Sequence, residues 1–202
     1  MYIFKKLAVF IFIIGFLNSC HGQQKITSQC DSSYQNAKLM IGKYGRSSDK
    51  YFLKKALQSL DTSLKCRDTK TESINLKITI YSLLEDYKDG ISFVDSLKKT
   101  DFNQPYERKM FSNIFKASQL AFKGDSIRSK TVYFGIASDI RQFLKKSKVD
   151  IFDKETFSNL FFVESKYLTQ SEISEQLDSL KMKFPNDSNF IDLLSKQYVD
   201  LP

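Results

Sequence analysis

The sequence predicts an all-α protein, and three observations point to this fold class. Apolar residues recur at helical spacing along most of the chain, breaker residues are scarce, and no stretch has the turn chemistry of a β-hairpin. The 202 residues include only 7 glycines and 3 prolines. Short polar breaks divide the chain into segments of helical length. We therefore expect antiparallel helix pairs over residues 29–202, forming one domain.

Nine helices are expected in this region, each bounded by a polar break. In chain order they are Gln29–Lys43, Asp49–Lys65, Thr71–Tyr87, Asp89–Lys99, Tyr106–Phe122, Asp125–Lys145, Asp153–Leu168, Ser171–Lys183 and Asp187–Val199. Asp49 and Asp125 stand where a side chain can accept from the free amides of a first turn. Ser171–Glu175 places polar and acidic residues at a helix start, and Pro185 follows a helix end.

Two segments contain strand-forming residues but fit a helix better. Residues 74–80 alternate between apolar and polar, yet the apolar positions continue as two helical stripes, 74/78/81 and 76/80/83/84. A helix that is buried on two sides shows both stripes. Residues 131–134 lead into a single stripe at 133, 136, 137, 140 and 144. Both segments are therefore expected to be helical.

The first twenty residues have the pattern of an export signal. Lys5 and Lys6 precede the apolar run Leu7–Leu17, which is too short to span a bilayer stably, and Leu17-Asn-Ser-Cys20 closes it. The segment resembles a bacterial lipoprotein signal, whose Leu-x-Ser-Cys lipobox is cleaved before a cysteine that receives diacylglycerol and an acyl chain such as palmitate. The resemblance implies a signal peptide at residues 1–19 and lipid attachment at Cys20. An ordinary signal peptide or an uncleaved anchor is the alternative.

Charge and composition narrow the classes of partner. Without Lys5 and Lys6, residues 20–202 carry 29 basic and 23 acidic residues, a net charge of +6. The lysines are scattered, which is typical of a solvated surface, and attraction to anionic headgroups near the anchor is the alternative. Residues 20–28 are polar and lack periodicity, which predicts a short tether. Nucleic acid fits poorly with an exported protein. His21 is the only histidine, so we expect no catalytic triad, no metal site and no cofactor.

The helix pairs resemble tetratricopeptide repeats. Segment 74–102 matches the family at both helices, through Ile78, Tyr81, Gly90, Val94 and Leu97. Segment 110–144 repeats the scheme more loosely, and the turns at Asp86 and Asp125 lie 39 residues apart, against 34 in the family. The resemblance implies a stacked α-solenoid. An irregular helical bundle would show the same apolar stripes and is the alternative.

The same resemblance implies a binding groove on the inner surface of the solenoid. In the family's register its lining would be Asn75, Thr79, Ser82, Ser118, Phe122, Ser158, Phe162 and Lys166. Polar residues interleaved with an exposed aromatic suit peptide recognition. Packing in the core is the default interpretation of the aromatic cluster around Phe157, Phe161 and Phe162, and a groove position for Phe162 is the alternative.

The three cysteines are consistent with an oxidising compartment. Lipidation of Cys20 leaves Cys30 and Cys66 as a pair. If the first two helices run antiparallel about a turn near residue 47, these two cysteines lie at the same end of the hairpin, within the reach of a disulfide. Two free buried thiols are the alternative.

These observations favour an anchored lipoprotein that acts, without catalysis, as a protein–protein interaction module or scaffold. Its partner would be an envelope protein or peptide. The tether lacks an acidic run of the kind that marks surface export, so we expect the outer membrane, facing the periplasm. A lipoprotein that binds a small ligand or glycan is the alternative, followed by a carboxylate-dependent hydrolase, which needs no histidine.

Overall fold

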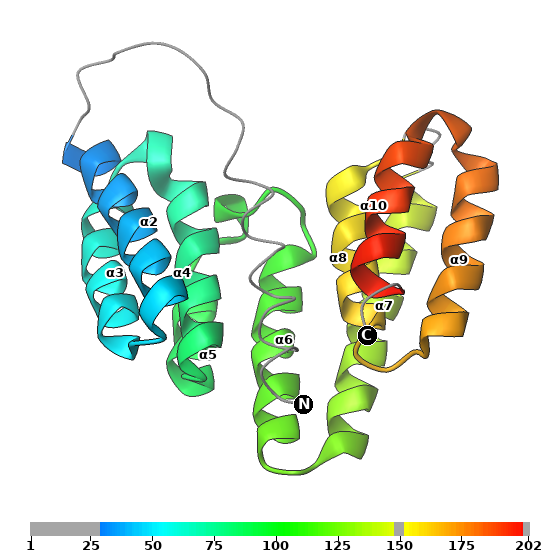
Figure 1. The fold of residues 1–202 in the computed structure, drawn as a ribbon, viewed down its shortest axis with the longest axis horizontal. Coiled ribbons are helices and arrows are strands. Elements are labelled where there is room, and N and C mark those ends of the chain that lie inside the picture. Colours follow the sequence, from blue (N-terminus) through cyan, green and yellow to red (C-terminus); the bar gives the residue numbers. More distant parts are fainter. Residues whose placement is uncertain (1–28, 148–151, 200–202) are drawn as a thin grey trace. The chain divides into compact units, whose positions relative to one another are not determined.

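The computed structural model describes residues 29–147 and 152–199. These residues form helices and turns without any strand, which confirms the all-α prediction (Figure 1). The predicted signal peptide (1–19), Cys20 and the predicted tether (20–28) lie outside the described residues. The chain divides into two compact units between Asn103 and Gln104. A single domain over 29–202 stays a prediction.

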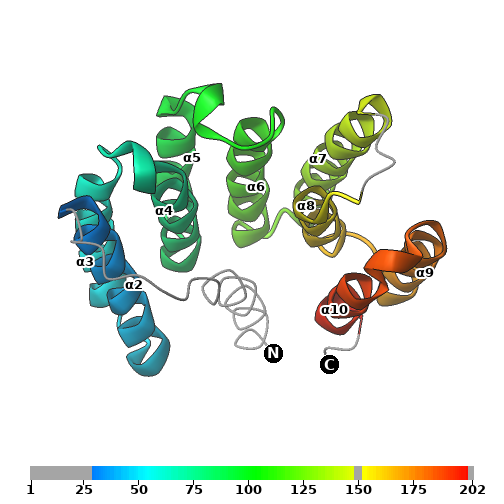
Figure 2. The ribbon, with the colours of Figure 1, turned by 90° about the horizontal axis from the view of Figure 1, so that it is seen from above.

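The first unit is a succession of helices in which each packs on the one before it (Figures 1 and 2). Its elements are α2 (Gln29–Ser47), α3 (Lys50–Ser63), the 3₁₀ turn η2 (Arg67–Thr69), α4 (Lys70–Leu84), α5 (Tyr87–Ser96) and the 3₁₀ turn η3 (Lys99–Asp101). Its core consists of Ala37, Ile41, Leu53, Ala56, Leu60, Leu76, Ile80 and Leu83. Removal of these side chains from water is the main force that holds the helices together.

Helix α4 is buried on two sides, as its two apolar stripes predict. Ile74 and Ile78 are buried together with Leu76 and Ile80. Lys77 is also buried, because its ammonium group donates to Asp61 at 2.6 Å and lies 4.9 Å from the centre of the Phe93 ring. A charged group can occupy such a position when its tip finds a partner at the surface.

The second unit contains α6 (Glu107–Phe122), α7 (Ser126–Lys146), α8 (Lys154–Glu164), α9 (Gln170–Lys183), the 3₁₀ turn η4 (Pro185–Asp187) and α10 (Ser188–Tyr198). It has two apolar clusters. The first joins α6, α7 and α8 through Tyr106, Met110, Ala117, Tyr133, Ile136, Ala137, Ile140, Leu160 and Val163. The second joins α8, α9 and α10 through Phe152, Phe161, Ile173, Leu177, Ile191 and Leu194.

A buried hydrogen-bond network fixes the start of α6 to α8. The Tyr106 hydroxyl donates to Thr156 Oγ1 at 3.0 Å and accepts from Asn159 Nδ2 at 3.3 Å. Thr156 in turn donates to Asp153 Oδ2 at 2.7 Å. Burial raises the pKa of Tyr106 to about 12, so the phenol stays protonated and able to donate.

Several helix ends differ from the prediction for local reasons. Helix α2 runs to Ser47, past the expected end at Lys43, because the packing of Tyr44 against the core outweighs the cost of about 1 kcal/mol for Gly45. Asp49 and Asp125 cap α3 and α7 as expected. Helix α9 begins at Gln170, one residue before the expected Ser171, because Thr169 caps it with Glu172 as the reciprocal partner.

The two turns that align in the tetratricopeptide register have the same geometry. Glu85 (φ 62°) and Gly124 (φ 85°) are both left-handed, and each is followed by an aspartate that caps the next helix. The amide of Asp86 bonds to the carbonyl of Tyr81 at 3.0 Å, and the amide of Asp125 bonds to that of Leu120 at 2.9 Å. A left-handed backbone favours glycine, so Glu85 is strained and Gly124 is relaxed.

This difference gives a stability prediction. Glu85→Gly is expected to raise the free energy of unfolding by about 0.5–1 kcal/mol, because glycine removes the steric cost of positive φ. Gly124→Ala is expected to lower it by about 1 kcal/mol. Urea unfolding followed by circular dichroism measures both. Glu85→Ala is the control, since it removes the same side chain but keeps the strain. Equal stability of the Gly and Ala variants at position 85 would contradict the explanation.

Candidate functional site

The predicted groove residues of the first unit lie along one face of α4. Asn75 is exposed, and Thr79 and Ser82 are half-buried. The Ser82 hydroxyl donates to the carbonyl of Ile78 at 3.2 Å, within its own helix. This face therefore offers one exposed amide and one half-buried threonine hydroxyl to a ligand.

The other five predicted groove residues belong to the second unit. Phe122 is exposed, whereas the Ser118 hydroxyl lies 3.1 Å from that of Tyr133. Phe162 is half-buried and the Lys166 ammonium lies 4.4 Å from its ring centre. Ser158 is buried and its hydroxyl donates to the carbonyl of Lys154 at 2.8 Å, so it is turned toward its own helix and does not face solvent.

The structure also brings together the two cysteines of the first hairpin. Cys30, in the first turn of α2, and Cys66, just after α3, form a disulfide with their Cα atoms 6.1 Å apart. This arrangement follows from the antiparallel packing of α2 on α3. Cys20, the predicted lipid attachment site, lies outside the described residues.

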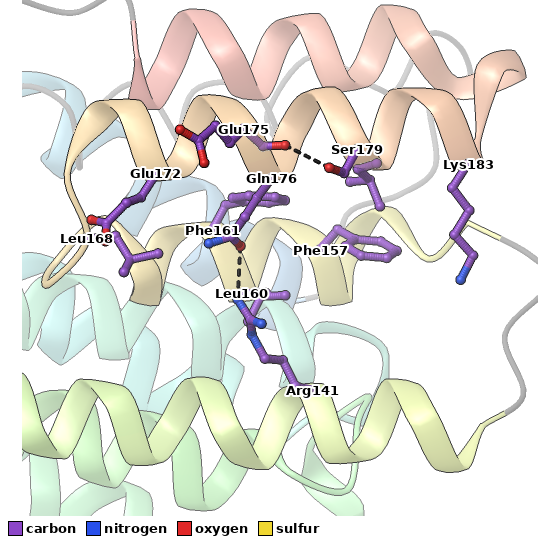
Figure 3. Close-up of a pocket in the computed structure, with 11 residues that line it drawn as sticks. Arg141, Phe157, Leu160, Phe161, Leu168, Glu172, Glu175, Gln176, Ser179 and Lys183 are labelled. Atoms are coloured by element: carbon purple, nitrogen blue, oxygen red, sulfur yellow. Dashed lines mark hydrogen bonds between the residues drawn. The ribbon is translucent and has the colours of Figure 1, made fainter.

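The second unit contains a cleft that the groove prediction does not include. It has a volume of about 550 Å³ and is open to solvent (Figure 3). Helices α7, α8 and α9 supply its lining, with the loop after α8. We call it the α7–α9 cleft, and its lining is Arg141, Phe157, Leu160, Phe161, Leu168, Glu172, Glu175, Gln176, Ser179, Leu180 and Lys183.

Apolar and charged groups are separated in the α7–α9 cleft. Its apolar residues come from α8, the following loop and one position of α9. Three of them, Phe157, Leu168 and Leu180, are partly exposed to solvent. Glu172 lies near the start of α9 and Lys183 at its end, at opposite ends of the cleft (Figure 3). Because Lys183 follows Glu172 by eleven helical residues, their Cα atoms lie about 16 Å apart along the axis of α9. The cleft therefore has an acidic end and a basic end.

A buried carboxylate holds Arg141 in place beside the cleft. Glu164 is fully buried, and its Oε1 accepts from Arg141 Nε at 2.8 Å and from Arg141 Nη2. Arg141 Nη2 also donates to Gln176 Oε1 at 2.9 Å, which bridges α7 to α9 (Figure 3). Among the described residues, no donor reaches Glu164 Oε2. The guanidinium, half-exposed, is thus fixed by two helices and faces the cleft.

The pKa of Glu164 reflects this burial. Desolvation raises the pKa of the carboxyl above its usual value, and the hydrogen bonds and charge of Arg141 oppose the increase. The ion pair with Arg141 therefore stabilises the charged form of the buried Glu164 carboxylate.

Sequence reasoning missed the α7–α9 cleft, although one signal was present. An apolar stripe runs through residues 157, 160 and 161 of α8 and continues at residue 168 in the following loop, and Glu164 stands within it. A carboxylate on an apolar stripe requires a buried cation or donor. That requirement points to a basic residue on a neighbouring helix, which the structure shows to be Arg141.

Within residues 29–147 and 152–199, no group of three or more His, Cys, Asp or Glu side chains is arranged to hold a metal ion. No helix of the same residues is long and apolar enough to span a bilayer. No protein-family model matches the chain, and no curated protein or solved structure matches it.

Proposed function

We propose that the chain is a membrane-anchored, non-catalytic lipoprotein that acts as a protein–protein interaction module in the cell envelope. Its anchor would be a lipid on Cys20, at the outer membrane and facing the periplasm. The lipobox-like segment Leu17–Cys20 supports this lipid-anchored location. Diacylglycerol with a further acyl chain gives durable anchoring, whereas one chain gives only marginal binding.

The α7–α9 cleft is the observation that carries the proposed interaction. Its partly exposed apolar surface provides contact area, and Arg141 is already oriented by Glu164 and Gln176. A pre-oriented arginine beside apolar side chains is typical of interface hot spots, because little conformational entropy remains to be lost.

The charges at the two ends of the cleft define the kind of partner. We propose an amphipathic helical segment that lays apolar residues at i, i+3 or i+4 and i+7 into the cleft. Such a segment would carry a basic residue near Glu172 and Glu175, and an acidic residue near Lys183. Opposite charges would favour one orientation of the bound helix over the reverse.

The helix pairs are proposed to be degenerate tetratricopeptide-like repeats. The shared left-handed turn and aspartate cap at Glu85-Asp86 and Gly124-Asp125 support this assignment. The two turns lie 39 residues apart, against 34 in the family, so the link between the two helix pairs would be longer than in the family. An array of such pairs is a common scaffold for peptide recognition.

Site-specific photocrosslinking in the native envelope tests the cleft, and metabolic labelling with palmitate tests the anchor separately. A photoreactive residue at Ser179, which lines the cleft, is expected to give a defined adduct, whereas one at exposed Leu193 on α10 is not. Leu180→Ser is expected to reduce the adduct roughly fivefold or more, since it removes an apolar contact of the cleft. Cys20→Ser is expected to abolish the incorporation of labelled palmitate into the protein.

Leu193→Ser is the matched control, because it makes the same substitution at an apolar residue of the same unit outside the cleft lining. It should leave the adduct unchanged. Equal adducts from positions 179 and 193, or equal losses from Leu180→Ser and Leu193→Ser, would reject the cleft as the binding surface. Incorporation of labelled palmitate into Cys20→Ser, or none into the wild-type protein, would reject lipid attachment at Cys20 without affecting the cleft.

A further inference from the structure

The first unit has a second cleft, between α2 and α3, with a different chemical character. Its volume is about 480 Å³. We call it the α2–α3 cleft, and its lining is Ser33, Asn36, Met40, Lys43, Tyr51, Phe52, Lys55, Gln58, Ser59 and Thr62. The lining contains two lysines, and none of these ten residues is acidic.

The two lysines of the α2–α3 cleft contact aromatic rings and not carboxylates. The Lys43 ammonium lies 5.8 Å from the centre of the Phe52 ring, and the Lys55 ammonium lies 5.6 Å from that of Tyr51. In the described part of the chain, neither ammonium forms an ion pair with an acidic side chain. Both charges are therefore available to an anionic ligand.

The polar floor of the α2–α3 cleft can complement an anion. Asn36 Nδ2 donates to Ser59 Oγ at 2.8 Å, and the Ser59 hydroxyl donates to the carbonyl of Lys55 at 3.3 Å. Ser33 and Thr62 supply further hydroxyls beside this pair. Hydroxyl and ammonium donors together are the groups that bind phosphate oxygens.

The surrounding hairpin extends the positive charge beyond the cleft. Residues 43–55 contain five basic residues and one acidic residue. The acidic residue is Asp49, whose carboxylate accepts from the amide of Tyr51 at 2.9 Å as the cap of α3. Tyr51 is 55% exposed and Leu39 is 52% exposed, which adds amphipathic and apolar groups to the basic surface. Lysines beside an exposed tyrosine are typical of surfaces that rest at a membrane interface.

We propose that the α2–α3 cleft and the basic residues around it dock onto anionic phospholipid headgroups of a bilayer. The nine residues 20–28 can span at most about 30 Å, so an anchor at Cys20 would keep the hairpin within reach of the same surface. A lipid anchor and a basic patch then act as two membrane signals. The proximity of the hairpin to the membrane rests on the proposed anchor. The positive charge of the cleft is independent of that anchor.

Vesicle co-sedimentation of the unlipidated chain tests the proposal apart from the anchor and the α7–α9 cleft. Residues 21–202 include every described residue and lack the lipid attachment site. This protein is expected to bind phosphatidylcholine vesicles that contain phosphatidylglycerol, and not vesicles of phosphatidylcholine alone. Lys43→Gln with Lys55→Gln is expected to weaken this binding roughly tenfold or more, and added salt should weaken it further.

Lys116→Gln with Lys130→Gln is the matched control, because it removes two exposed lysines of the second unit at the same change in net charge. Its binding should fall by much less. Equal losses in the two double variants would overturn the proposal in favour of an unlocalised charge effect, and so would equal binding to both vesicle types. Binding of polyglutamate with no binding to anionic vesicles would overturn it in favour of an acidic protein ligand. Circular dichroism verifies that each variant is folded.

Discussion

Replacing Cys30 and Cys66 by serine is expected to lower the free energy of unfolding of the first unit by about 3–4 kcal/mol. The bond closes a loop with a sequence separation of 36, so its main effect in the chain-entropy model is to restrict the unfolded chain. Hydrogen exchange resolved by mass spectrometry should show faster exchange in α2 and α3. Amides of α6–α10 should keep their protection, because the bond lies wholly within the first unit.

Peptide mapping without reductant gives the control for this prediction. Wild-type protein purified under oxidising conditions should yield a linked peptide pair that contains Cys30 and Cys66. Recovery of both cysteines unlinked would show that the bond does not form in the protein. Faster exchange spread equally over both units would show that its effect is not confined to the first hairpin.

Arg141→Met is expected to lower the free energy of unfolding at neutral pH by about 3 kcal/mol. The substitution keeps much of the side-chain volume but leaves the fully buried Glu164 without its cation. Glu164→Gln should cost less, because a buried amide carries no charge. The double variant Arg141→Met/Glu164→Gln should be more stable than Arg141→Met alone, and urea unfolding of the four proteins measures the coupling.

The pH dependence supplies a further test of this ion pair. Burial raises the pKa of Glu164 in the folded state above its value in the unfolded chain. The neutral carboxyl therefore contributes stability at acid pH, and this contribution is lost as the pH rises through the raised pKa. Loss of Arg141 removes the groups that hold this pKa down. The stability deficit of Arg141→Met should therefore be smaller at acid pH than at neutral pH. A deficit that does not change with pH would show that lost packing, and not the buried charge, destabilises the variant.

Much of the secondary structure could be predicted from the sequence. The two stripes of residues 74–84 identified a helix buried on both sides, and the caps Asp49 and Asp125 occur where the free amides require them. Helix ends were less predictable, because they depend on packing. Helix α2 continues through Gly45 because Tyr44 packs against the core, and Glu85 adopts a left-handed backbone usually reserved for glycine.

The candidate sites were less predictable for a physical reason. The α7–α9 cleft is lined by residues as far apart in the sequence as Arg141 and Lys183, so its shape depends on how three helices pack. Repeat register placed Ser158 on an exposed surface, but a serine hydroxyl can equally bond to the preceding turn of its own helix, as it does here. The aromatic cluster near Phe161 belongs to the core, as the default interpretation of the sequence expects.

The position of the disulfide has a mechanical consequence. Force on the chain before Gln29 enters α2 one residue from Cys30 and passes through the sulfur bridge to Cys66, beyond the end of α3. The pull therefore bypasses the length of the first helix, which cannot be peeled from its neighbour turn by turn. A protein tethered through its amino-terminal segment could thus withstand tension while its first hairpin stays closed.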